Sequence, residues 1–213
     1  LILFFRLMLS YNTNLIQYKR LEKTYCNLIY CILIFVSAVR AESVGTDTLS
    51  YIKDYAELGT YSLSDVIEQY KDYEGFYVFS WLCHKAGLSL QVWLCLVSMM
   101  LILPVAKFID SYSKDKIYSV LCFLSMGAFE FSLAGIKQTM AMGIMLSAFY
   151  LLIKKRYILS FLFGVWAYFC HKTSLIFLLV IPLYLFRGGK YFKTGIIILC
   201  VLFFSFFLTD SDS

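Results

Sequence analysis

Apolar runs separated by short polar clusters account for most of the chain. They cover approximately residues 24–39, 90–109, 117–136, 138–153, 157–170, 173–186 and 194–208. A helix needs about 20 mostly apolar residues to cross a bilayer, and Tyr, Lys and Thr at the ends of shorter runs can extend them toward the headgroups. The pattern predicts an all-α fold, a polytopic transmembrane helix bundle of about seven spans. We expect one integral membrane domain over residues 1–213.

Two pairs of neighbouring runs are separated by only one or two polar residues. Lys137 alone separates one pair of runs, and His171 with Lys172 separates another. Each pair forms either a tight helical hairpin or two re-entrant half-helices, and the sequence leaves both open. A further apolar run begins at Leu1. We expect it to be the back end of a truncated transmembrane helix.

Basic residues indicate how the chain is oriented. They cluster at alternate boundaries, around residues 19–23, 107–116, 154–156 and 187–193. Short loops rich in Lys and Arg stay cytoplasmic, so the other boundaries are expected at the outer face. These include the hydrophilic segment 40–89, which we predict to be one long extracytoplasmic loop with an interfacial aromatic part. Its acidic middle, residues 57–72, is expected to be a solvated lid or a plain loop.

Composition supports the membrane class. The chain is 61% hydrophobic with a mean hydropathy of +0.74, whereas soluble domains are about 45–50% apolar. The formal net charge is +5, but the basic residues lie in small groups between apolar runs, which excludes the basic patch of a nucleic-acid-binding protein. No metal or cofactor motif is present, so neither a metal nor a cofactor is expected.

Three polar motifs are expected at the outer face, each with an ordinary explanation beside a functional one. Asp47 lies in G-T-D-T, either as a turn residue or as a carboxylate available to a sugar hydroxyl or a metal. Glu74 opens E-G-F-Y, the start of an aromatic run that either packs at the interface or forms a sugar platform. Lys137, followed by Gln138, either anchors a helix end or binds an anionic group such as phosphate.

Glu130 and His171 carry the same ambiguity. Glu130 lies seven residues before Lys137, on the same face of one predicted helix and about 10 Å away. It is either a structural partner of Lys137 or a functional carboxylate. A lone His is usually structural, but its near-neutral pKa also suits a general base beside outer-face carboxylates.

The order of these motifs resembles the EpsG family. Arg40 is followed by V-G-T-D-T-L-S-Y, E-G-F, G-I-K-Q-T-M-A and C-H-K-T-S-L-I, over residues 40–186. The family consists of multispanning bacterial membrane proteins of exopolysaccharide and capsule loci, related to Wzy-type polymerases. Two features depart from its pattern. Lys137 replaces the usual Arg and lacks the bidentate fork, and Ser174 lies one place late, so Thr173 is the candidate counterpart.

The resemblance implies that polyprenyl-diphosphate-linked repeat units are polymerised into exopolysaccharide, capsule or O-antigen at the outer face of the bacterial cytoplasmic membrane. Such a glycosyltransferase needs no nucleotide. Asp47, Glu74 and His171 are the alternative catalytic proton acceptors, and the choice among them stays open. Arg40 and Lys137 would neutralise the diphosphate. The residues expected to bind substrate are Arg40, Thr46, Tyr51, Glu130, Lys137, Gln138, Thr173 and Ser174.

Expected partners are the lipid-linked glycan, membrane lipids, and the flippase and chain-length regulator of the same pathway. Two other functions are kept as alternatives. A transporter or flippase of lipid-linked glycans would place polar residues through the membrane midplane, where only Glu130 is found. The other alternative is a non-catalytic, truncated membrane subunit.

Overall fold

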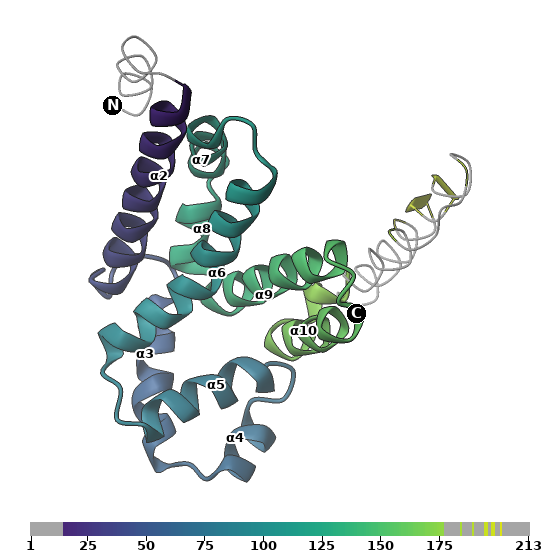
Figure 1. Cartoon of the computed structure of the whole chain (residues 1–213). Coiled ribbons are helices and arrows are strands. Elements are labelled where there is room, and N and C mark those ends of the chain that lie inside the picture. Colours follow the sequence, from purple (N-terminus) through teal and green to yellow (C-terminus); the bar gives the residue numbers. More distant parts are fainter. Residues whose placement is uncertain are drawn as a thin grey trace.

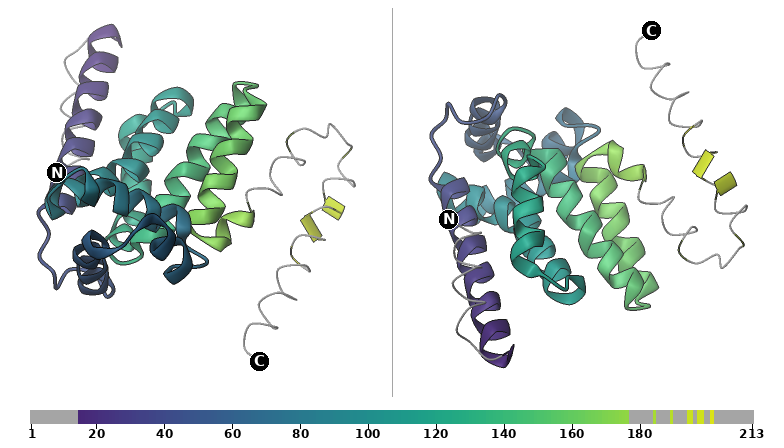
Figure 2. Two further views of the ribbon diagram at one scale, coloured as in Figure 1. Left: turned by 90° about the horizontal axis from the view of Figure 1, so that it is seen from below. Right: turned by 90° about the horizontal axis from the view of Figure 1, so that it is seen from above.

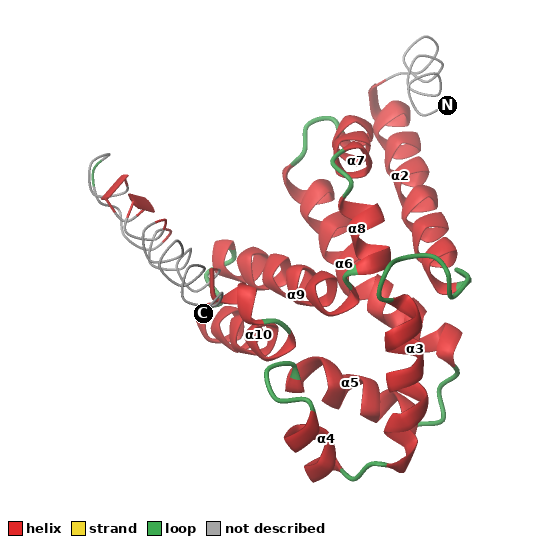
Figure 3. Cartoon of the chain, turned by 180° about the vertical axis from the view of Figure 1, so that it is seen from behind, coloured by secondary structure: helices red, strands yellow, loops and turns green. Residues whose placement is uncertain are grey.

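The computed structural model describes residues 15–176 and the separate positions 184, 189, 194, 195, 197, 198 and 201. Within residues 15–176 every regular element is a helix (Figure 3). The elements are α2 (Leu15–Ala38), α3 (Thr48–Glu57), the 3₁₀ turn η1 (Leu58–Thr60), α4 (Leu63–Gln69), α5 (Glu74–Lys85), α6 (Leu90–Tyr112), α7 (Lys116–Ser125), α8 (Ala128–Ala134), α9 (Ile136–Ile153), α10 (Tyr157–Cys170) and the 3₁₀ turn η2 (Lys172–Ser174). The all-α prediction is confirmed for this part of the chain.

Three of these helices are long and apolar enough to cross a membrane, namely α2, α6 and α9. α7 and α8, bent by 48° at a short break, together make a fourth candidate, and α10 has only 14 residues. The described residues therefore give three or four candidate spans, and the expected seven are not seen. The predicted runs 173–186 and 194–208, and the N-terminal helix fragment, lie largely outside the described residues.

The apolar run over residues 117–136 does not form one continuous helix, although its two helices together remain a candidate span. Gly127 has φ of +73°, a left-handed conformation that ends α7 and that Gly adopts without strain. A second interruption follows at Gly135, between α8 and α9. Lys137 and Gln138 consequently lie in the first turn of α9 and do not form a linker before it.

The long helices pack in the order α2, α6, α9, α10 (Figures 1 and 2). α6 and α9 cross in backbone contact, because a Cβ on Gly143 would overlap the carbonyl oxygen of Met100. One buried cluster joins α2, α6 and α7, around Ile102 and Ile117. A larger one joins α3, α4, α5, α6, α9 and α10 around Phe76 and Trp93, and it carries the functional candidates.

The hydrophilic segment 40–89 is folded into helices, so its acidic middle, residues 57–72, is not a plain loop. It forms α3, η1, α4 and α5, and the side chains of Tyr51, Tyr55, Leu58 and Val66 are buried. The first three of these positions recur at helical spacing, so α3 and η1 have an apolar face despite their polar composition. α4 begins with a capping box between Ser62 and Asp65.

The first two basic clusters meet at one end of the bundle. Asp110 of α6 forms ion pairs with Lys23 of α2 and with Lys116 of α7. The buried Glu22 accepts a hydrogen bond of 2.9 Å from the backbone N–H of Lys116. This contact agrees with the predicted common side of the two clusters, while the assignment of that side to the cytoplasm stays a prediction.

Candidate functional site

The first motif docks on the last turn of α8, just before α9. Gly45 has φ of +91°, and a Cβ there would overlap the carbonyl oxygen of Leu133, so only Gly fits. The buried hydroxyl of Thr48 lies 2.6 Å from the carbonyl oxygen of Val44 and 3.0 Å from that of Leu133. These contacts bring the beginning of α3 beside the beginning of α9.

Asp47 lies at this junction as the N-cap residue of α3. It is exposed, as is Thr46, and its side chain makes no capping hydrogen bond. Tyr51, one turn later, is buried, and burial followed by the charge of Asp47 raises the pKa of its hydroxyl to about 12. The charge of Asp47 also acts on Lys137. The carboxylate of Asp47 is therefore uncommitted to the helix cap and lies in the electrostatic neighbourhood of Lys137.

Lys137 is surrounded by tyrosine rings. Its Nζ atom lies 3.9 Å from the centre of the Tyr73 ring and 5.4 Å from the centres of the Tyr51 and Tyr77 rings. We call these three tyrosines the lysine cage. Cation–π attraction holds an ammonium without neutralising it. Among the described residues no carboxylate forms an ion pair with Lys137, so its charge is available to an anion.

Asp54 of α3 contacts the cage through Tyr77. The hydroxyl of Tyr77 donates a hydrogen bond of 2.6 Å to its Oδ2 atom, and the charge of Asp54 acts on Lys137. The ring of Tyr70 stacks on that of Tyr77 with centroids 3.6 Å apart. Burial, followed by the hydrogen bond to Asp54, raises the pKa of Tyr77. Tyr77 is thus a fixed hydrogen-bond donor whose orientation is set from two sides.

His171 approaches the same cage from the end of α10. Its ring lies 5.6 Å from that of Tyr73. The Nδ1 atom accepts a hydrogen bond of 3.4 Å from the backbone N–H of Thr173 and lies 2.8 Å from the Thr173 hydroxyl. A backbone N–H only donates, so neutral His171 carries its proton on Nε2. Burial, followed by the charge of Lys137, lowers the pKa of His171 below its ordinary 6.5.

Close contacts fix α5 against α10. A Cβ on Gly75 would lie 2.9 Å from the backbone carbon of Phe169 and 3.0 Å from the backbone nitrogen of Cys170. Lys172 forms an ion pair with Asp72 in the turn before α5. The E-G motif and the C-H-K-T-S motif therefore meet, and the glycine of the first is needed for the close approach.

Glu74 lies at this junction but outside the cage. It is half-buried in the first turn of α5 and lines an apolar groove of about 660 Å³ between α5 and α10, with Trp166 and Phe169 on the facing helix. No hydrogen bond or ion pair joins it to Lys137 or His171 in the described part of the chain. Of the three candidate proton acceptors, Asp47 and His171 are therefore the two connected to the lysine cage.

The remaining candidates are dispersed. Ser174 is buried and donates a hydrogen bond of 3.0 Å to the carbonyl oxygen of Ala167, and Gln138 is half-buried beside Lys137. Glu130 is exposed on α8. The prediction that it shares a helix face with Lys137 is wrong, because Gly135 separates their helices.

Arg40 follows α2 and has unused hydrogen-bonding capacity. Its Nη1 atom donates a long bond of 3.4 Å to Ser37, whereas Nε and Nη2 are buried without a partner among the described residues. Burial lowers the pKa of its guanidinium. A buried guanidinium with free donors is suited to an anion. No direct contact joins Arg40 to the lysine cage within the described residues.

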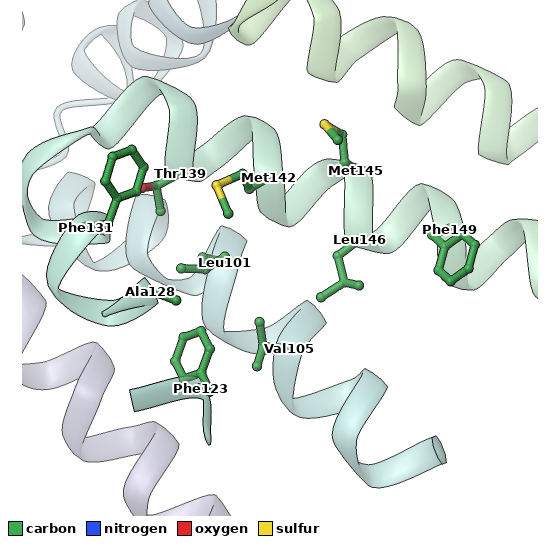
Figure 4. Close-up of a pocket in the computed structure, with 10 residues that line it drawn as sticks. All are labelled: Leu101, Val105, Phe123, Ala128, Phe131, Thr139, Met142, Met145, Leu146 and Phe149. Atoms are coloured by element: carbon green, nitrogen blue, oxygen red, sulfur yellow. The ribbon is translucent and has the colours of Figure 1, made fainter. Parts of the chain in front are cut away.

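A separate apolar cavity of about 500 Å³ lies between α6, α7, α8 and α9 (Figure 4). Thr139 and Phe131 lie at one end and Phe149 at the other. The hydroxyl of Thr139 is buried without a hydrogen-bond partner in the described structure. Because two residues correspond to about 200° around a helix, Thr139 faces away from Lys137. This cavity is therefore distinct from the cage.

Three side chains of this site, Asp54, Tyr70 and Tyr73, were not anticipated from the sequence, and Tyr77 was expected only as part of the aromatic run that begins at E-G-F-Y. All four belong to the hydrophilic segment 40–89. A usable signal was present, because tyrosine recurs through Y-K-D-Y-E-G-F-Y at residues 70–77. The cation that these rings surround lies more than 50 residues away in sequence, so no local pattern pointed to it.

Comparison with known proteins gives one match. A family model described as the EpsG family matches residues 23–211, which is most of the chain. No curated protein and no solved structure shows significant similarity to it. The matched range contains all the motifs from Arg40 to Ser174. The chain is a member of the EpsG family, whose proteins are broadly Wzy-like polysaccharide polymerases.

Proposed function

We propose that this chain polymerises polyprenyl-diphosphate-linked oligosaccharide repeat units at the outer face of the bacterial cytoplasmic membrane. The product is an exopolysaccharide, capsule or O-antigen chain. Membership of the EpsG family and the apolar helices support this assignment. The pathway's flippase and chain-length regulator are the proposed protein partners.

The observation that carries the proposal is that Lys137 has no ion-pair partner among the described residues. Its ammonium is enclosed by three aromatic rings and forms no ion pair among the described residues. Keeping a cation partly buried and unpaired costs free energy, which an anionic substrate group would offset. A diphosphate has the charge and the oxygen acceptors to do this, and the buried guanidinium of Arg40 has further unused donors.

The reaction breaks the bond between the anomeric carbon of the donor glycan and its diphosphate oxygen. A hydroxyl oxygen of the next lipid-linked unit forms the new bond to that carbon. Lys137 compensates the charge that develops on the departing diphosphate. The hydroxyl proton passes to Asp47, whose carboxylate is exposed and forms no capping hydrogen bond.

His171 takes a different part in this scheme. Because Nδ1 accepts from Thr173, neutral His171 presents an N–H donor at Nε2. It therefore serves as a hydrogen-bond donor to the leaving diphosphate or to a sugar hydroxyl. This tautomer favours Asp47 over His171 as the proton acceptor and makes Thr173 the residue that sets the tautomer.

Complementation of a bacterial strain that lacks its polymerase tests the proposal. The unmodified chain is expected to restore long glycans, and Lys137→Met to leave single repeat units on lipid. Lys154→Met is the matched control, since Lys154 also lies near a tyrosine ring, 5.5 Å from the centre of Tyr150, but at the opposite end of α9. Long glycans with Lys137→Met would refute the assigned site.

The same experiment separates the alternatives. A flippase would show a loss of lipid-linked units from the outer leaflet in the variant, whereas a polymerase variant accumulates them there. A non-catalytic subunit would give no long glycans even with the unmodified chain. Each outcome is visible in the length distribution and in the accessibility of the lipid-linked units.

A further inference from the structure

A carboxylate beside the lysine cage could pair with Lys137 and so compete with an anionic substrate. Asp54 is a carboxylate whose charge acts on Lys137, and both groups belong to the same cluster of helices α3, α5 and α9. An oppositely charged pair in a partly buried site normally closes into an ion pair. Here no ion pair between Asp54 and Lys137 forms.

The hydrogen bond from Tyr77 explains why Asp54 and Lys137 do not form an ion pair. Its hydroxyl donates to Asp54 at 2.6 Å, a short distance that is typical of a bond to a charged acceptor. The Tyr77 ring is 4% exposed and cannot move freely, because Tyr70 stacks on it and Phe76 meets it edge-on. Asp54 is therefore held on the α5 side, by a donor that is itself fixed.

We infer that Tyr77 is a positioning residue that holds Asp54 away from Lys137 and so keeps the ammonium free to bind a diphosphate. The inference rests on the proposed role of Lys137. Without the Tyr77 hydroxyl, Asp54 lacks its hydrogen-bond donor and is free to pair with the flexible side chain of Lys137, on which its charge already acts. The resulting ion pair would then compete with the substrate.

A pair of variants distinguishes this role from simple packing. Tyr77→Phe keeps the ring and its stacking but removes the hydroxyl, so Asp54 is released to occupy Lys137. Replacing Asp54 as well, with Asn, removes the competing charge. Asp54→Asn should therefore restore the diphosphate binding that Tyr77→Phe weakens. If the two substitutions merely damaged a packed cluster, their losses of binding would add.

The test measures the binding of inorganic diphosphate to the purified full chain in detergent micelles by isothermal titration calorimetry. Tyr77→Phe should weaken binding about tenfold, because diphosphate must then displace Asp54 from Lys137. The Asp54→Asn, Tyr77→Phe double variant should return to within about threefold of the unmodified chain. Tyr70→Phe is the matched control, because it removes the hydroxyl of the stacked ring and leaves the Tyr77–Asp54 bond intact.

Three results would overturn the inference. These are the absence of diphosphate binding by the unmodified chain, unchanged binding by Tyr77→Phe, and a double variant as weak as Tyr77→Phe. Circular dichroism and elution volume check that each variant is folded. If the chain is not a polymerase, the unmodified chain will form no polymer in cells, yet the variants can still show the expected pattern of diphosphate binding. The two failures are therefore distinguishable.

Discussion

The Nζ atom of Lys137 lies 3.9 Å from the centre of the Tyr73 ring. Lys137 belongs to α9 and Tyr73 to the turn before α5. Between these two elements the chain forms α5, the candidate membrane span α6 and the bent pair α7–α8. The ring of Tyr73 also lies 5.6 Å from the imidazole of His171. Tyr73 is thus the common neighbour of Lys137 and His171.

Tyr73→Leu should lower polymer formation by about 2- to 30-fold, because a cation–π contact contributes about 0.5 to 2 kcal/mol. Tyr73→Phe keeps the π face and should retain most of the activity. The initial rate of glycan elongation in membranes measures both variants. Equal losses with Leu and Phe would show that the hydroxyl of Tyr73, and not its ring, is what matters.

Gly45→Ala should destabilise the fold by more than about 2 kcal/mol, since it adds a steric clash with Leu133 to the cost of a left-handed backbone. Gly87→Ala is the control, because Gly87 has φ of +73° but a methyl group added there would meet no atom within 4 Å. It should cost only about 1 kcal/mol. Thermal unfolding in detergent compares the two. Equal effects would contradict the docking of the beginning of α3 on the last turn of α8.

The fold is visible in the sequence where periodicity and length decide the structure. The apolar runs over residues 90–109 and 138–153 correspond closely to α6 and α9. The run over residues 117–136 does not correspond to one helix, because the backbone conformations of Gly127 and Gly135 interrupt it. An isolated glycine in an apolar run does not reveal whether it bends the helix or only packs closely.

The candidate site was only partly predictable for a different reason. Lys137 and His171 were identified because a charged or titratable residue between apolar runs is conspicuous, and Asp47 because it lies in the turn sequence G-T-D-T. Tyr77 was noted only as part of an aromatic run and Asp54 was not noted, since their importance depends on Lys137 of a helix far along the chain. Local composition shows the tyrosines but does not identify the cation that they contact, whereas the burial of Tyr51 follows from its helical spacing.

His171 should titrate below its ordinary pKa of 6.5. Its folded pKa is lower than its unfolded one, so the stability that it contributes is complete above about pH 6.5 and is lost as the pH falls through the folded value. Lys137→Met removes the nearby positive charge and should raise the pKa of His171. Because burial is the larger cause, the value should stay below 6.5.

Nuclear magnetic resonance of histidine-labelled chain measures this directly. The chain has two histidines, and His84→Asn assigns the signals. A pKa of His171 above 6.5, or one that falls with Lys137→Met, would contradict the electrostatic arrangement of the cage.

Thr139→Val should leave polymer formation unchanged and stabilise the fold by about 1 kcal/mol, because it replaces a buried hydroxyl without a partner in the described structure by a methyl group of similar size. Thermal unfolding and glycan length are the two measurements. Thr139 lies two residues from Lys137 but faces the apolar cavity of Figure 4. A loss of polymer with Thr139→Val would show that the cavity belongs to the site.

The central claim is that Lys137, held in its tyrosine cage, binds the diphosphate of a lipid-linked repeat unit during polymerisation. The most direct measurement supplies purified chain, in liposomes, with radiolabelled polyprenyl-diphosphate-linked repeat units and follows glycan length. The unmodified chain should give long glycans and free polyprenyl diphosphate. Lys137→Arg should retain at least about a tenth of that rate because the charge is kept, and Lys137→Met should give only single units. Long glycans from Lys137→Met at the unmodified rate would contradict the account.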